Sequence, residues 1–235
     1  MSHLPSLDVL DRDGAIQEAS EKVDPETRAA FLKKAGVGLG AVAVGGAFAG
    51  ALPGIARGQA IPQSDIDILN FALTLEFLEA EFYAQANRNQ AYGNNRELRR
   101  FSTVVAQHEK VHENFLKKVL GSKAVARPKF DFKDTVTNGA KFAATAQVLE
   151  DTGVHAYLGQ VPNIKTKAVL LGAGRILPVE ARHAAWIRRL AGVLPAPDAF
   201  DEPLSKRRVL NVVDDTRFVV SAARTRGSGN PRYTG

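Results

Sequence analysis

The sequence predicts an all-α protein built on a bundle of four long helices with one long crossover connection. From Ser64 onward, apolar residues recur at helical spacing, and no stretch shows the two-residue alternation of a strand. The connections between the four apolar-patterned stretches are short, long and short in turn. That order is typical of a four-helix bundle with one crossover.

Capping and turn residues give the boundaries of the four helices. Ser64 and Asp65 are suitable N-cap residues for the first helix, which we expect to end near Ala91, before the turn at 93–95. The other helices are expected at about 95–120, 138–158 and 165–191, with residues 122–137 as the long crossover. Pro178 predicts a kink or a restart in the fourth helix. Residues 204–224 are expected to add a peripheral helix or strand.

The chain divides into three expected parts. Residues 1–60 contain a charged segment, an uncharged run rich in Ala, Gly and Val, and a small-residue cleavage site at Ala60, which together predict a signal peptide. The bundle takes residues 61–195, and residues 196–235 form an irregular, partly disordered extension. The string T-R-A-A-F-L-K at 27–33 resembles a twin-arginine (Tat) signal, although Ala29 replaces the second arginine.

We therefore expect an exported bacterial protein, periplasmic, extracellular or at the cell envelope, that contacts the membrane transiently through its signal segment. Retention of that segment as an anchor is the alternative, but its glycines make it a poor permanent span. The formal net charge of +6 is spread along the chain without an aromatic-interleaved patch. We accordingly expect no nucleic-acid partner, whereas an anionic envelope surface suits this charge.

The absence of cysteine excludes several classes of site. Disulfides, zinc ribbons, iron–sulfur clusters and thiol nucleophiles all require this residue. Any metal must be held by His, Asp and Glu, which favours iron, manganese or zinc.

The string H-E-K-V-H at 108–112 permits two interpretations. As H-E-x-x-H, it is the motif of a zinc peptidase. As E-x-x-H, from Glu109 to His112, it recurs at Glu180–His183, which the peptidase interpretation leaves unexplained. Side chains three residues apart on a helix differ in direction by roughly 60°, so both can reach one metal. Two such pairs supply half of a dinuclear carboxylate site.

The other half requires one glutamate from the first helix and one from the third. Glu150 is the candidate on the third helix, and Glu76, Glu79 and Glu81 compete on the first. Glu76 and Glu150 each have a tyrosine seven residues later, at Tyr83 and Tyr157, and lie 33 and 30 residues before an E-x-x-H glutamate. The chain therefore contains two copies of one unit, with Glu and Tyr on one helix and E-x-x-H on the next.

This pattern resembles that of the ferritin-like di-iron carboxylate superfamily, and the sequence around it is most similar to the desiccation-related branch. The strings LNFALTLEFLEAEFYAQA, LEDTGVHAYLG and ILPVEARHAAWIRRLAG carry the likeness, which spans about residues 62–195. The resemblance implies a ferritin-like bundle holding two Fe or two Mn ions. The implied ligands are Glu76, Glu109, His112, Glu150, Glu180 and His183. Glu109 and Glu180 would bridge metals about 3.5–4 Å apart.

Several nearby residues have weaker expected roles. Glu79 lies near the face of Glu76 and can support the ligands from outside, whereas Glu81 is rotated away and expected in solvent. Tyr83 and Tyr157 can be core aromatics, hydrogen-bond donors to ligand carboxylates or electron relays. His108 and His155 are expected outside the ligand set.

The functional expectation is a metal protein whose small substrates are dioxygen, peroxide or Fe(II), in oxidative or desiccation stress. Ferroxidase, peroxidase and manganese-catalase-like activities all fit, and a homo-oligomer is compatible with the resemblance. The alternative is a non-enzymatic protective or envelope-associated scaffold with a structural metal site.

Overall fold

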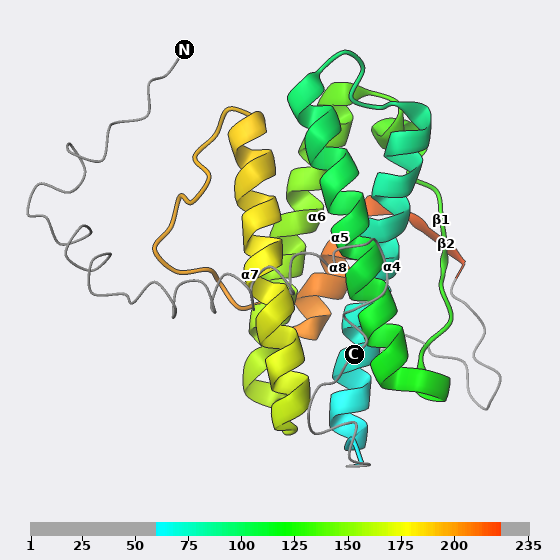
Figure 1. Ribbon diagram of the computed structural model, residues 1–235, viewed down its shortest axis with the longest axis vertical. Helices are drawn as coiled ribbons and strands as arrows, with labels where there is room; N and C mark the ends of the chain where they lie inside the picture. The colour runs from blue at the N-terminus through cyan, green and yellow to red at the C-terminus, as the bar shows by residue number, and fades with distance from the viewer. Residues whose placement is uncertain (1–59, 222–235) are drawn as a thin grey trace, which may run out of the picture. The chain divides into compact units, whose positions relative to one another are not determined.

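The computed structural model describes residues 60–221, where four long helices lie side by side (Figure 1). Their bounds are α4 Gln63–Asn89, α5 Arg96–Leu120, α6 Gly139–Gln160 and α7 Lys167–Leu190. The most extensive packing joins α4 to α5 and α6 to α7, and the two pairs meet through α4–α6 and α5–α7. The predicted all-α bundle is confirmed, and α5 and α6 are joined by the long crossover. The predicted signal peptide lies outside the described residues except for Ala60.

Asparagine side chains begin two of the helices. Asn95 accepts a hydrogen bond from the Leu98 amide at the start of α5, and Asn138 accepts one from the Lys141 amide at the start of α6. Both satisfy amides that have no partner within the helix.

The predicted cap of the first helix is wrong. Helix α4 begins at Gln63 after Pro62, without a side-chain cap. The buried Asp65 carboxylate instead accepts hydrogen bonds from the backbone amides of Lys165, at 3.0 Å, and Thr166, at 2.8 Å, just before α7. Burial raises the pKa of Asp65, but these backbone hydrogen bonds outweigh it and leave the pKa below its ordinary value. Asp65 therefore ties the beginning of α4 to the beginning of α7.

Pro178 lies within one continuous helix, so the predicted restart does not occur. A proline has no N–H to bond the carbonyl four residues earlier, here that of Gly174. Both residues lie on the exposed face of α7, where water can bind that carbonyl.

The crossover pairs with the C-terminal segment, which is more regular than predicted. The crossover contains η2 Gly121–Lys123, β1 Lys129–Phe130 and η3 Lys133–Val136. Helix α8, Lys206–Thr216, precedes strand β2, Val219–Ser221, which pairs antiparallel with β1. Val209, Val213 and Phe218 are buried in the core. The segment therefore adds both a helix and a strand, because it covers an apolar face of the bundle.

A glycine allows the segment before α8 to approach α6. A Cβ at Gly159 would lie 1.9 Å from the Leu204 carbonyl oxygen, so no larger residue fits there. The Leu204 amide bonds the His155 carbonyl at 3.1 Å, and the His155 ring lies 2.6 Å from the Glu202 carbonyl oxygen. His155 therefore fastens the C-terminal segment and lies outside the ligand set, as expected.

The core differs between the two ends of the bundle. At the end of α4, the Phe82 ring stacks on Phe142 at 5.4 Å and meets Phe132 edge-on. At the beginning of α4, where α5 and α6 end, the core is mainly aliphatic, with Leu69 and Leu116 among its residues. Within residues 60–221, no helix combines the length and apolar composition that a membrane crossing requires.

Candidate metal centre

The six predicted residues converge at mid-length of the four long helices. All six are buried, and His112 is the most exposed, at 8%. Each helix contributes its own part: Glu76 from α4, Glu109 and His112 from α5, Glu150 from α6, and Glu180 and His183 from α7.

These side chains form two overlapping groups, and within each group the potential ligand atoms lie within 4.8 Å of one another. Glu76 and His112 belong only to the first group, and Glu150 and His183 only to the second. Glu109 and Glu180 belong to both. The bundle thus offers two adjacent positions, each surrounded by three carboxylates and one imidazole.

Both shared carboxylates direct one oxygen toward each histidine. His112 Nδ1 lies 3.3 Å from Glu109 Oε2 and 3.0 Å from Glu180 Oε1. His183 Nδ1 lies 3.0 Å from Glu109 Oε1 and 3.8 Å from Glu180 Oε2. A carboxylate that bridges two cations needs this orientation. The unshared glutamates complete the groups, with Glu76 Oε2 3.4 Å from His112 Nδ1 and Glu150 Oε2 3.2 Å from His183 Nδ1.

The donor atoms fit a pair of cations. Six of them are buried without a hydrogen-bond partner: Glu76 Oε2, Glu109 Oε1, Glu150 Oε2, both Glu180 oxygens and His183 Nδ1. His183 Nδ1 and Glu109 Oε1 are only 3.0 Å apart, yet their angles do not make a hydrogen bond. Unsatisfied buried polar atoms are costly, and a metal would satisfy all of these. Four glutamates also carry the negative charge that two divalent cations neutralise.

Burial and mutual repulsion shape the protonation of the site. Burial raises the pKa of Glu109 well above its ordinary value, and the charge of Glu180 adds to this. Burial also opposes ionisation of Glu180, but the imidazoles of His112 and His183 close to its carboxylate outweigh it and lower the pKa of Glu180 to about 2. Burial disfavours the His183 imidazolium, yet Glu150 and Glu109 outweigh it and raise the pKa of His183 to about 12. Protons and metals therefore compete for the same donor atoms.

The two tyrosines bond across the bundle. Tyr83 of α4 donates a short hydrogen bond to Glu150 of α6, and Tyr157 of α6 donates one to Glu76 of α4 at 2.5 Å. Burial and the adjacent carboxylate raise the pKa of both phenols well above the ordinary value, so both remain donors at neutral pH. Each tyrosine therefore orients the glutamate of the opposite helix.

A fifth buried carboxylate lies beside the centre. Glu79 is 3% exposed, and a Cβ added at Gly153 would lie 3.3 Å from both Glu79 Oε1 and Glu180 Oε2. Burial raises the pKa of Glu79 well above its ordinary value, and repulsion from Glu180 adds to the shift. Glu79 therefore accompanies the six residues as a neutral acid, in space left by the missing side chain of Gly153.

His108 contacts the centre from outside. Its Nδ1 lies 2.8 Å from His183 Nε2, and the two rings stack with centroids 5.1 Å apart. It belongs to neither ligand group among the described residues. The H-E-x-x-H string is thus split between His112, which faces Glu109, and His108, which supports a residue of another helix. This arrangement favours the E-x-x-H interpretation over that of a zinc peptidase.

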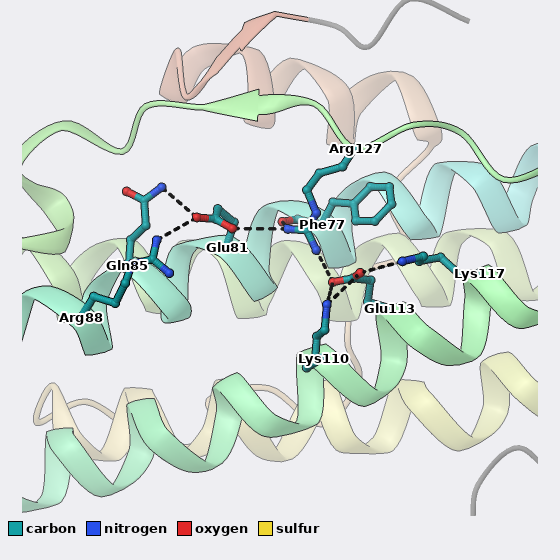
Figure 2. Close-up of polar contacts among 8 residues, drawn as sticks. All are labelled: Phe77, Glu81, Gln85, Arg88, Lys110, Glu113, Lys117 and Arg127. Carbon is teal, nitrogen blue, oxygen red and sulfur yellow. Dashed lines mark hydrogen bonds and ion pairs between the residues drawn. The ribbon is translucent and has the colours of Figure 1, made fainter. Parts of the chain in front are cut away.

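A network of charges beside the first group was not predicted (Figure 2). Glu113, next to His112, is 1% exposed and bonds Arg127 of the crossover, with Lys110 at 3.1 Å and Lys117 at 3.4 Å. The guanidinium also lies 4.7 Å from the Phe77 ring centroid and 3.3 Å from its carbonyl oxygen. The only sequence signal was the pair of lysines three residues before and four after Glu113. Arg127 is remote in sequence.

Glu81 joins the same network and is not simply solvated. It accepts hydrogen bonds from Gln85 at 3.1 Å and Arg88 at 3.0 Å, and lies 3.5 Å from Arg127 (Figure 2). It points away from the ligand groups, as its helical position predicts.

Comparison with known families gives one match. A family model described as a ferritin-like domain matches residues 64–193, which is more than half of the chain and includes all six predicted ligand positions. No curated protein sequence matches the chain with significant similarity. The buried carboxylate and imidazole groups are donors that could hold metal ions, in agreement with the ferritin-like match.

Proposed function

Because this chain belongs to the ferritin-like family, we propose that it is a dinuclear metal protein, di-iron or di-manganese, that acts on Fe(II), dioxygen or peroxide. One observation carries the proposal: Glu109 and Glu180 belong to both ligand groups and direct one oxygen to each histidine. Such sharing supports two metals in contact with common ligands. A single metal needs no such sharing.

The proposed roles follow from the grouping. Glu109 and Glu180 would be shared by the two metals, Glu76 and His112 would complete the ligands of one, and Glu150 and His183 would complete those of the other. A pair of redox-active metals, when bound, supplies the electrons exchanged with dioxygen or peroxide.

The remaining residues hold this donor set in place. Tyr83 and Tyr157 keep the two unshared glutamates oriented through phenolic hydrogen bonds. The buried Glu79 carboxyl lies next to Glu180 and is one of the polar groups beside the donor set. Apolar side chains around the donors exclude bulk water and strengthen the electrostatic attraction for cations.

We further propose export and a role in oxidative or desiccation stress. The support for export is the signal-like composition of residues 1–60, with its Tat-like string. The stress role rests on the resemblance of the helix strings to the desiccation-related branch. A fractionation experiment with the full-length chain, probing cytoplasm, membrane and periplasm, tests the export; a wholly cytoplasmic protein would contradict it.

Metal analysis tests the core of the proposal. Protein purified without added metal should contain about two equivalents of iron or manganese per chain, and the loaded protein should oxidise Fe(II) or consume peroxide. Absence of stoichiometric metal would contradict the proposed dinuclear metal site. Two bound metals with neither turnover would favour a stress-protective scaffold with a structural metal.

A further inference from the structure

A small cavity lies within the bundle, beside the candidate metal centre. It is lined by residues from all four long helices, among them Ala72 of α4, Leu116 of α5, Tyr157 of α6 and Ala173 of α7. Each lies on the same side of the centre: Ala72 precedes Glu76 by one turn, Leu116 follows His112 by one turn, and Ala173 precedes Glu180 by two turns. The cavity is therefore at the end of the bundle where α4 begins, which is the lower end in Figure 1.

Tyr157 connects the cavity to the centre. Its ring lines the cavity, and its hydroxyl donates the 2.5 Å hydrogen bond to Glu76. A molecule in the cavity is thus separated from the first ligand group by one side chain. At the opposite end of the bundle, the rings of Phe82, Phe101 and Phe142 pack around Tyr83, with ring centroids 5.2 to 6.0 Å from the Tyr83 ring.

The lining of the cavity selects an apolar occupant. Nearly all of it is aliphatic or aromatic carbon, Gln160 is its one amide side chain, and the Tyr157 hydroxyl is already engaged by Glu76. A buried water needs two to four polar partners, and apolar cavities of this kind stay dry while accepting inert gases. Hydrogen peroxide, which donates and accepts hydrogen bonds, would lose its hydration without replacement.

The size of the cavity restricts the occupant to a very small molecule. It leaves about 20 Å³ for the centre of a water-sized molecule. One such molecule needs about 10–15 Å³ on this measure. A diatomic gas fits, whereas a fatty acid or an aromatic ring does not.

We propose that this cavity is a binding site for a small apolar gas molecule and that, if the proposed function holds, its occupant is dioxygen waiting next to Tyr157 and Glu76. The site would then distinguish the two oxidants: dioxygen reaches the centre through the aliphatic end of the bundle, and peroxide does not.

Xenon binding tests the cavity without any metal. Crystals of the full-length protein pressurised with xenon, or xenon NMR in solution, should show one occupied site between Ala72, Leu116 and Ala173. Ala173→Leu should abolish it by filling the space. Ala143→Leu, a change at a half-buried alanine at the other end of the bundle, should leave it intact. A folded wild-type protein that takes up no xenon would overturn the proposal.

Oxidant kinetics test the identity of the occupant. With Fe(II) as the reductant, Ala173→Leu should raise the KM for dioxygen several-fold and leave the KM for peroxide unchanged. Equal changes for both oxidants, or an unchanged KM for dioxygen, would overturn dioxygen as the occupant. If Ala173→Leu unfolds the protein, the smaller Ala173→Val is used, with the melting temperature as the check. Xenon bound by a protein that never oxidises Fe(II) would contradict the proposed function and leave the gas site standing.

Discussion

The two helix pairs, α4–α5 and α6–α7, carry the same donors at the same spacings within each helix but surround them differently. Each pair offers a glutamate, a tyrosine seven residues later and an E-x-x-H motif. Outside this repeat, equivalent positions hold unlike residues: Glu79 against Gly153, His108 against Val179, and Glu113 against Ala184. The first pair carries the additional polar groups, and the second offers small or apolar residues in their place. The repeated positions thus build the centre, while the differing positions decide how each half is supported.

The largest expected effect comes from the residues that the two pairs share. Glu109→Ala or Glu180→Ala should remove both metals, because each carboxylate serves both ligand groups. Glu76→Ala, which affects one group, should leave about one metal per chain. Elemental analysis measures all three variants. If full metal content survives both Glu109→Ala and Glu180→Ala, the assigned ligand set is wrong.

A change in pH should affect both pairs alike. The folded-state pKa of His183 is about 12 and that of His112 is also raised, against 6.5 in the unfolded chain. Each imidazolium therefore stabilises the metal-free fold fully below pH 6.5, and this stabilisation is lost as pH rises toward the folded-state pKa. Metal binding must displace these protons, so affinity should rise about tenfold per pH unit for each proton released.

Isothermal titration between pH 6 and pH 9, in buffers of different ionisation enthalpy, measures both the affinity and the proton release. Adding metal should also remove the alkaline loss of stability, which thermal melts follow. An affinity independent of pH would show that the histidines are already neutral before the metal binds.

The network around Glu113 should stabilise the first pair only. Arg127→Met leaves a carboxylate that is 1% exposed without its guanidinium, so the free energy of unfolding should fall by about 1–3 kcal/mol. Arg88→Met, at an exposed ion pair with Glu81, should cost less than about 1 kcal/mol. Urea denaturation compares the two variants. Equal losses would mean that Lys110 and Lys117 suffice for Glu113.

His108 should give the smallest effect, confined to the second group. Its ring supports His183 from outside, so His108→Ala should weaken the metal held by His183 and Glu150 by about tenfold and leave the other metal unchanged. Gln107→Ala, at an exposed neighbour on the same helix, serves as the control. Stepwise metal titrations resolve the two affinities; a uniform loss at both metals would point to a general disturbance of α5.

Local pattern was enough to predict the bundle and to select the six residues that the structure brings together. Helical periodicity placed Glu76, Glu109, Glu150 and Glu180 on inner faces, and the repeat distinguished Glu76 from Glu81. Contacts between segments distant in sequence could not be predicted this way. Asp65 is a residue type that often caps helices, but its buried carboxylate accepts hydrogen bonds from the backbone amides just before α7 instead.

The crossover shows the same limit. Nothing near Arg127 in the sequence indicates that it reaches Glu113 and Phe77, and nothing near β1 indicates its pairing with β2. These contacts depend on how the connection folds back over the bundle, which hydrophobic periodicity does not encode.

The tyrosine contacts between the two halves have a consequence for the symmetry of the molecule. Tyr83 of the first half donates a hydrogen bond to Glu150 of the second half, and Tyr157 of the second half donates one to Glu76 of the first. The two halves therefore make equivalent contacts with each other. Reciprocal contacts of this kind are the mark of a two-fold symmetric dimer. The bundle therefore has the geometry of two similar helical hairpins related by an approximate two-fold axis and joined by the crossover. Because both hairpins belong to one chain, equivalent positions such as Glu79 and Gly153 can differ, and exact symmetry does not constrain the site.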